Sequence, residues 1–470
     1  MMSTIKGSNS LFVLQGLKRN EIMKHDLQES KFIHMTTAPV KKLVLSMAIP
    51  SIISMLVTAF YNMADTLFVG KISTQATGAI GVVFSYMTLI QAISFFFGHG
   101  CGNFISRSLG AKKIEEAEKM AATGFFSALF VGVIIGIAGV VFVEPLLIFL
   151  GATDTILPDA KAYITYILIA TPFIMGSFVL NNIMRLQGNA GTAVIGIASG
   201  AVINVALDPI LIFGFKMGTA GAGVATAVSQ FISFCLLLFL SGKGDGVKIR
   251  WKNFTFKWRS YVEICAGGIP SLARQGLASI STICLNNVAG LYGDSSIAAF
   301  SVVSRIGVIF NSALIGFGQG FQPVCGFNYG AGKNDRVKEA FWFCVKVATI
   351  AMTAIGIMTY IFAKPLVCLF RDDDAELVKI AVKALKFQCL SMPLMGYIVL
   401  SNMCLQNTRK TIRATITAMA RQGLMLIPAI YILNYFWGIL GMQMAQCVAD
   451  VFTFVLVIPL MSTALKEMKL

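Results

Sequence analysis

The feature of this chain that most constrains its fold is a series of apolar runs long enough to cross a lipid bilayer. One run extends from Phe125 to Val143, and a helical span needs about 18 or more mostly apolar residues. Only 13% of the 470 residues are charged, whereas about 25% are charged in an average soluble domain. So little charge cannot cover a soluble surface of this size. The chain is therefore predicted to be a helical membrane protein, which argues against a soluble enzyme or a nucleic-acid-binding protein.

Twelve helical spans are predicted, in an all-α integral membrane fold. If the N-terminus is cytoplasmic, 26 of the Lys and Arg residues lie on the cytoplasmic side, six on the other side and six within spans. The positive-inside rule selects this orientation, which places a multi-pass protein in the cell (inner) membrane with both termini cytoplasmic. The predicted spans are 43–70, 78–106, 120–143, 158–184, 190–214, 219–241, 261–290, 297–325, 340–362, 379–404, 412–434 and 438–462.

An internal repeat divides the spans into two sets of six. A shift of 220 residues without gaps aligns Pro50 with Pro270 and Gly110 with Gly330, among other pairs. Because six is even, both copies have the same orientation, so the two lobes are related by a pseudo-two-fold axis along the membrane normal. The predicted organisation is a basic cytoplasmic segment (1–42), an N-lobe (43–241), a cytoplasmic linker (242–260) and a C-lobe (261–470). Transporters with parallel repeats bind substrate near the midplane between the halves.

Motifs typical of enzymes and of bound cofactors are missing from the sequence. The ten cysteines are scattered without a CxxC pair, and three histidines are too few for a metal site. There is no nucleophile elbow and no phosphate-binding loop. We therefore expect neither an enzyme nor a resident cofactor.

Ionisable residues within spans are costly and are the first candidates for function. The N-lobe has Asp65 in its first span and Asp208 in its fifth, and Asn204 precedes Asp208 by one helical turn. Thr226 in the sixth span adds a hydroxyl. Carboxylate, amide and hydroxyl oxygens suit a proton or an alkali cation. The alternative, that these groups only form interhelical hydrogen bonds, stays open at this point.

The C-lobe has a different charge pattern. Leu285 and Pro428 occupy the positions near the counterparts of Asp65 and Asp208. Arginines lie within its spans instead, and we expect Asp450 to form an ion pair with Arg421, one helix away. Acidic chemistry is therefore predicted to be confined to the N-lobe. The arginines are Arg274, Arg305 and Arg421.

Pro50 lies 15 residues before Asp65 in the first span. A proline removes one backbone hydrogen bond and favours a bend. Pro50 is either an ordinary kink at the entrance of this helix or a conformational hinge that changes the surroundings of Asp65.

Four features together resemble the multidrug and toxic compound extrusion (MATE) family, over nearly the whole chain after residue 42. They are the segments Tyr61 to Gly70, Ser106 to Ala111 and Arg185 to Asn189, and the spaced set Asn204, Asp208 and Thr226. The resemblance implies two six-helix lobes in a V shape and cation-coupled antiport of amphipathic, often cationic, drugs by alternating access. The acidic N-lobe resembles the DinF-like and MepA-like branch of the family.

The resemblance also implies roles for particular residues. It assigns Asp65, Asn204, Asp208 and Thr226 to the coupling cation, either H⁺ or Na⁺, so that any metal ion bound there is Na⁺ in transit. The substrate cavity is expected to include Tyr61, Asn181, Arg274 and Gln275. The implied partners are small-molecule drugs and the lipid bilayer, without nucleic acid, and the protein is expected to be a monomer.

A lipid-linked oligosaccharide flippase of the same superfamily is the main alternative function. Such a protein moves a pyrophosphate-bearing lipid and favours cationic residues at its cavity. Arg274 and Arg305 are consistent with this alternative, whereas Asp65 and Asp208 argue against it.

Overall fold

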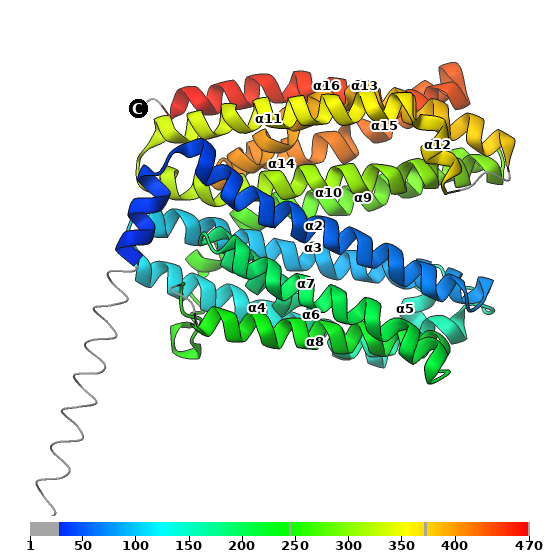
Figure 1. Ribbon diagram of the computed structural model, residues 1–470, viewed down its shortest axis with the longest axis horizontal. Coiled ribbons are helices and arrows are strands. Elements are labelled where there is room, and N and C mark those ends of the chain that lie inside the picture. The colour runs from blue at the N-terminus through cyan, green and yellow to red at the C-terminus, as the bar shows by residue number, and fades with distance from the viewer. Residues whose placement is uncertain (1–27, 244–245, 371–373, 469–470) are drawn as a thin grey trace, which may run out of the picture.

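The computed structural model describes residues 28–243, 246–370 and 374–468, and this part of the chain is helical throughout without a β-strand (Figure 1). Parts of the predicted N-terminal segment and of the linker lie outside the described residues. A helical segment over residues 28–37 precedes the first long helix. The helices that follow are α2 (Val40–Gly70), α3 (Thr74–Gly110), α4 (Ile114–Val141), α5 (Val143–Phe149), α6 (Leu157–Leu186), α7 (Ala190–Pro209), η1 (Ile210–Gly214), α8 (Gly218–Lys243), η2 (Trp251–Asn253), α9 (Trp258–Gly290), α10 (Asp294–Gly330), α11 (Asn334–Ile361), α12 (Ala363–Cys368), α13 (Ala375–Asn407), α14 (Thr411–Met419), η3 (Ala420–Leu424), α15 (Leu426–Trp437) and α16 (Ile439–Glu467).

The predicted spans are found as long helices. Within the described chain, 11 helical segments are long and apolar enough to cross a membrane. The remaining long helix is α9, which is 33 residues long but contains Glu263, Arg274 and Gln275 and is therefore less apolar. Each of the twelve predicted spans overlaps one of these segments, so the helical membrane fold is confirmed.

The two halves of the chain form two bundles that meet along α2, α3, α9 and α10 (Figure 1). In this region α2 packs against α10, and α3 packs against both α9 and α10. Both ends of the described chain lie at one end of the molecule, here called the terminal face, and the short helices α5 and α12 lie at the other end, here called the distal face. The α2 and α9 helices both run from the terminal face to the distal face, as expected for two copies with the same orientation.

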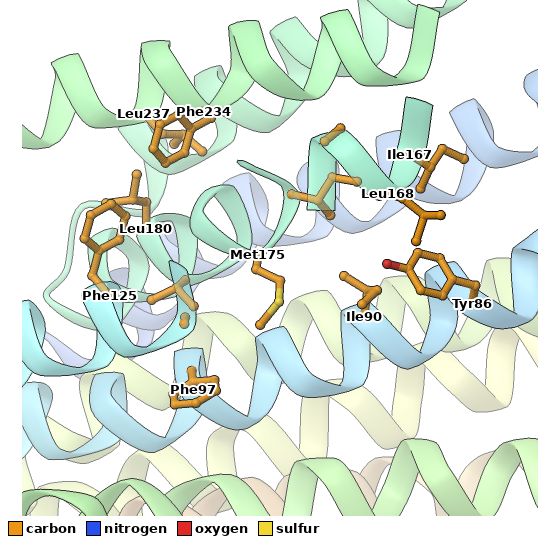
Figure 2. Packing of buried hydrophobic residues seen from close by; sticks show 14 of the residues in the cluster. Tyr86, Ile90, Phe97, Phe125, Ile167, Leu168, Met175, Leu180, Phe234 and Leu237 are labelled. Atoms are coloured by element: carbon orange, nitrogen blue, oxygen red, sulfur yellow. The ribbon is translucent and has the colours of Figure 1, made fainter. Parts of the chain in front are cut away.

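Each lobe has its own apolar core. The N-lobe core brings together α3, α4, α6 and α8, and Figure 2 shows Phe97, Met175 and Phe234 within it. The C-lobe has one buried cluster in its distal half and one in its terminal half, and the terminal cluster also includes Met35 and the first turns of α2. Large apolar side chains such as Phe130 and Ile137 on α4 are exposed outside these cores, as expected for helices that face lipid.

Pro50 lies inside α2, which is a continuous α-helix from Val40 to Gly70. The proline therefore does not break α2 in this conformation. Its role as a hinge stays a prediction.

Candidate substrate and cation site

The four N-lobe residues assigned to a coupling cation lie in one buried polar network. The Tyr163 hydroxyl on α6 donates a hydrogen bond to Asp65 Oδ2 at 2.8 Å, and it also lies against the Thr226 hydroxyl. Asn204 Nδ2 donates to Thr226 Oγ1 at 3.3 Å and to Asp208 Oδ1 at 3.5 Å. The network therefore runs from α2 through α6 and α8 to α7.

Several oxygen atoms of this network have no hydrogen-bond partner. Asp65 Oδ1, Asp208 Oδ2 and Asn204 Oδ1 are buried atoms that accept no hydrogen bond from any described residue. No described lysine, arginine or histidine forms an ion pair with either carboxylate. Buried acceptors without partners are costly, and a proton or a small hard cation would satisfy them. These oxygen ligands therefore fit H⁺ or Na⁺.

The local chain geometry places Asp208 at an irregular point of its helix. Pro209 follows it directly, and the chain then continues as the π-helical turn η1 from Ile210 to Gly214. Proline cannot donate a backbone hydrogen bond, and π-turns are frequent at functional sites. Asp208 is completely buried at this point, and Asp65 is 8% exposed.

Tyr163 belongs to this network and was missed by the sequence analysis. It lies 98 residues from Asp65 in the sequence and is 1% exposed. A single tyrosine in an apolar span carries no spacing signal that relates it to a carboxylate on another helix. Only the packing of α6 against α8 and the rest of the N-lobe brings its hydroxyl to the site.

A cavity of about 320 Å³ lies between the lobes in the distal half of the molecule. Asn62 and Thr66 of α2 and Phe84 of α3 line it on the N-lobe side, and Ser304 and Arg305 of α10 line it on the C-lobe side. We call it the interlobe cavity. Both lobes contribute to its wall, as expected for a transporter with its substrate site between two repeats.

Two smaller pockets adjoin the interlobe cavity. The N-lobe pocket of about 50 Å³ shares Asn62 and Phe84 with it and contains Tyr61 and Gln230. The C-lobe pocket of about 240 Å³ shares Ser304 and Val308 of α10 with it. The three spaces therefore adjoin one another, from the region of the buried N-lobe network to the interior of the C-lobe.

The ion pair expected for Asp450 is present. Arg421 Nε lies 2.9 Å from Asp450 Oδ1, and Ser391 Oγ donates to Asp450 Oδ2 at 2.8 Å. Asp450 is completely buried. This carboxylate is therefore already neutralised by a fixed cation, in contrast to Asp65 and Asp208.

The residues expected in the substrate cavity have different surroundings. Tyr61 lines the N-lobe pocket, and its hydroxyl lies against Gln230. Asn181 donates from Nδ2 to the Ala193 carbonyl at 3.0 Å, so it links α6 to α7. Arg274 is half-buried on α9, and its neighbour Gln275 has a buried Nε2 without a partner among the described residues. Their part in substrate binding stays a prediction.

Glycines close the space between the lobes in the terminal half of the molecule. A Cβ atom on Gly110 would lie 2.1 Å from the Phe327 carbonyl oxygen, and one on Gly330 would lie 2.0 Å from the Arg107 carbonyl oxygen. Gly110 and Gly330 are equivalent in the 220-residue repeat, as are Arg107 and Phe327. The backbones of α3 and α10 therefore meet at a symmetric crossing that only glycine permits.

Buried polar contacts also join the lobes in this half. Arg185, at the end of α6, donates to the Gln319 carbonyl at 2.7 Å, to Gln322 Oε1 at 2.9 Å and to His99 Nε2 at 3.3 Å. Because a guanidinium can only donate, His99 Nε2 is the acceptor and its Nδ1 carries the proton toward Ser271 Oγ, 2.8 Å away. Arg185 directly follows the predicted span 158–184 and was therefore expected in a loop, but it is only 3% exposed and bridges the lobes.

An ion-pair cluster lies nearer the terminal face. Glu263 of α9 accepts from Arg107 of α3 at 3.3 Å and also pairs with Arg409. Arg107 further donates to the Asn407 carbonyl at 3.0 Å. We call these contacts, together with the glycine crossing and the Arg185 contacts, the terminal seal.

Residues 28–39 cross the terminal seal and contact both lobes. Lys31 Nζ donates to Asn189 Oδ1 at 2.5 Å on the N-lobe side. On the C-lobe side, Lys333 Nζ donates to the Thr36 carbonyl at 3.0 Å and Arg336 to the Ala38 carbonyl at 2.6 Å. These cations bind carbonyls at the end of the helical segment, where backbone acceptors lack helical partners. Residues 28–39, the described part of the basic N-terminal segment, thus form a strap across the terminal face.

Comparison with protein families gives one match that covers more than half of the chain. The family model described as MatE matches residues 50–210 and again residues 270–432. The two matches coincide with the two copies of the internal repeat.

Comparison with individual proteins gives full-length relatives. The chain is 26% identical over 429 residues to the multidrug export protein MepA of Staphylococcus haemolyticus (strain JCSC1435), which covers 90% of this chain and 94% of that protein. It is also 26% identical over 430 residues to MepA of Staphylococcus aureus (strain NCTC 8325 / PS 47), with the same coverage.

Solved structures with the same fold are also found. A structure described as the outward-facing conformation of a multidrug resistance MATE family transporter has a TM-score of 0.88 and 24% identity, over 93% of this chain and 98% of that chain. A MATE transporter of Vibrio cholerae has a TM-score of 0.86 and 20% identity, over 91% of this chain and 97% of that chain.

Proposed function

The chain belongs to the MATE family, and on this premise we propose that it is a secondary active multidrug efflux transporter. It exports amphipathic, often cationic, compounds by antiport with H⁺ or Na⁺. The observation that carries the proposal is the N-lobe network, in which two buried carboxylates and an amide leave three oxygen atoms without partners. The names of the MepA relatives support multidrug export as the function.

Coupling follows from the cost of holding two carboxylates in the N-lobe without a fixed cation. Asp65 and Asp208 lie close enough to interact, so the network is most stable when it holds a positive charge. An ion from one side of the membrane and a cationic drug from the other both supply that charge. The two therefore compete for the lobe, which is the simplest form of antiport. Tyr163, Thr226 and Asn204 hold the carboxylates in place and supply neutral oxygen ligands.

Transport also requires that ligand affinity differ between two conformations. The positive-inside rule supports an orientation in the cell (inner) membrane in which the terminal face and both termini are cytoplasmic. The conformation described here is then closed to the cytoplasm by the terminal seal and has its interlobe cavity toward the outside. Opening to the cytoplasm requires the seal and the strap of residues 28–39 to separate. We propose that a single chain performs this cycle as a monomer.

The orientation has a direct test. A reporter fused after Lys243 is expected in the cytoplasm, and one inserted at Asp294 is expected outside. Both reporters on the same side of the membrane would contradict the twelve-span topology.

The transport function is tested with purified protein in liposomes. A cationic dye should leave the vesicles when a proton or sodium gradient is imposed, and imposing each gradient separately identifies the coupling ion. The flippase alternative is not favoured, since the N-lobe carboxylates have no cationic partner and the relatives are named for multidrug export. Turnover of a lipid-linked oligosaccharide without any dye efflux would reverse this conclusion.

A further inference from the structure

The two lobes hold opposite charges on either side of the interlobe cavity, a buried pair of carboxylates in the N-lobe and an arginine in the C-lobe wall of the cavity. On the N-lobe side, the buried network contains Asp65 and Asp208. On the C-lobe side, Arg305 is the one charged residue among those that line the interlobe cavity. A cavity for monovalent cations alone would gain nothing from an arginine in its wall, because like charges repel.

Arg305 lies on the face of α10 that is turned toward the interlobe cavity. It is exposed, as are Ser301, Ser304 and Val308, and all four residues line that cavity. It comes 11 residues after Asp294, so it lies about 16 Å along α10 from the distal end of the helix. No described acidic residue forms an ion pair with it. An unpaired arginine within a span is costly and indicates a functional site.

The C-lobe pocket beside Arg305 is rich in carboxamides. Gln388, Gln422 and Gln446 line it together with Asn311, whose Oδ1 is buried without a partner among the described residues. Arg421 also lines the pocket, but its charge is balanced by Asp450. Carboxamides can both donate and accept hydrogen bonds. The pocket can therefore hold a polar group of a ligand without adding net charge to the C-lobe.

We propose that Arg305 and the adjoining C-lobe pocket form a second substrate subsite, which binds an anionic group such as a carboxylate. The ligand is a dipolar amphipathic compound whose cationic group is bound by the N-lobe. A guanidinium matches a carboxylate with two parallel hydrogen bonds, and the surrounding carboxamides complete its shell. The inference rests on the proposed efflux function and names Arg305 as the residue that favours substrates with an anionic group over simple cations.

A pair of dyes that differ in one carboxylate tests this subsite. Rhodamine B is a zwitterion with a free carboxylate, and its ethyl ester keeps the cationic ring system but loses the anion. Binding of both dyes is measured by fluorescence anisotropy with the full-length protein in phosphatidylcholine nanodiscs. The variants are Arg305→Gln, Arg305→Lys and, as the matched control, Lys364→Gln, which removes an exposed cation of α12 outside the cavity lining.

Arg305→Gln is expected to weaken rhodamine B binding about three- to tenfold and to leave binding of the ester unchanged or slightly tighter. Arg305→Lys should retain part of the preference for the zwitterion, and Lys364→Gln should match the wild type. If the wild type binds the ester but Arg305→Gln leaves the rhodamine B affinity unchanged, the subsite is wrong while the efflux function stands. If the wild type binds neither dye, the efflux function fails and the subsite fails with it.

A lipid headgroup is another source of an anion near Arg305. The same titrations in nanodiscs that contain phosphatidylglycerol distinguish the two sources. A dependence on Arg305 that persists in both lipids supports a drug subsite. If wild type and Arg305→Gln differ in phosphatidylcholine but become equal in phosphatidylglycerol, the guanidinium binds the lipid phosphate, which overturns the proposal.

Discussion

Gly110→Ala is predicted to open the terminal seal. The new methyl carbon would lie 2.1 Å from the Phe327 carbonyl oxygen, whereas close carbon–oxygen contacts are about 3.3 Å. The clash is with backbone, so no side-chain rotation relieves it, and α3 and α10 must separate by about 1 Å. Asn407 ends α13, which packs against α10 and moves with it, so the 3.0 Å hydrogen bond from Arg107 to the Asn407 carbonyl would then exceed hydrogen-bonding distance.

The size of the shift toward the terminal-open state follows from the loss of the hydrogen bond between Arg107 and the Asn407 carbonyl. A hydrogen bond to a charged group contributes about 1.5–3 kcal/mol. Because about 1.4 kcal/mol is a factor of ten, the ratio of terminal-open to terminal-closed molecules should rise roughly 10- to 100-fold. Gly330→Ala, at the equivalent position of the repeat, should have a similar effect, since its methyl carbon would lie 2.0 Å from the Arg107 carbonyl oxygen.

Electron–electron double resonance measures the shift in the ratio of terminal-open to terminal-closed molecules. Spin labels on unnatural amino acids at Lys71 and Leu291, at the distal ends of α2 and α9, should show a new population at shorter distance in Gly110→Ala. Gly191→Ala is the matched control, because a Cβ there has no neighbouring atom within 4 Å. A distance distribution in Gly110→Ala equal to that of the wild type would refute the idea that the glycine crossing sets the closed state.

Three further residues are tested by substitution, one of them with a matched control. Met35→Glu places a charge at a strap position that is 1% exposed and should shift the distance between the same two labels toward the terminal-open state. Ile33→Glu, at a strap position that is 50% exposed, is the control and should leave this distance unchanged. Equal shifts in the two variants would contradict a role for the strap. Tyr163→Phe removes the hydrogen bond to Asp65 and should reduce ion-driven efflux several-fold without loss of folded protein, so unchanged efflux would remove Tyr163 from the site. Asp450→Asn breaks a buried ion pair and should lower the free energy of unfolding by about 3–5 kcal/mol, while much of the efflux per folded molecule remains. Abolished efflux at unchanged stability would place the coupling site in the C-lobe.

The helices and their repeat could be predicted from the sequence because both depend on local patterns. A long apolar run determines a span, and the aligned glycines and prolines identify the two copies. The grouping of Asn204, Asp208 and Thr226 could also be predicted in part, since Asn204 and Asp208 share one helical face. The family match to residues 50–210 and 270–432 agrees with the repeat found from the sequence.

The contacts between distant helices could not be predicted in this way. Nothing in the spacing of Arg185 distinguishes it from a loop cation, yet its guanidinium binds Gln319 and Gln322 across the lobes. The same holds for Tyr163, which reaches Asp65 only because α6 packs beside the N-lobe network. The contacts of such residues depend on three-dimensional packing, for which a single sequence carries little signal.

We propose above that the N-lobe carboxylates couple an ion gradient to drug export. The most direct measurement is efflux of the ethyl ester of rhodamine B from proteoliposomes under separate proton and sodium gradients. The comparison uses the wild type, Asp208→Asn and the control Asp294→Asn, which changes an exposed carboxylate at the start of α10. One gradient is expected to drive efflux by the wild type and by Asp294→Asn, whereas Asp208→Asn is expected to fold but not to respond to that gradient. Full gradient-driven efflux by Asp208→Asn would contradict the account and place the coupling site elsewhere.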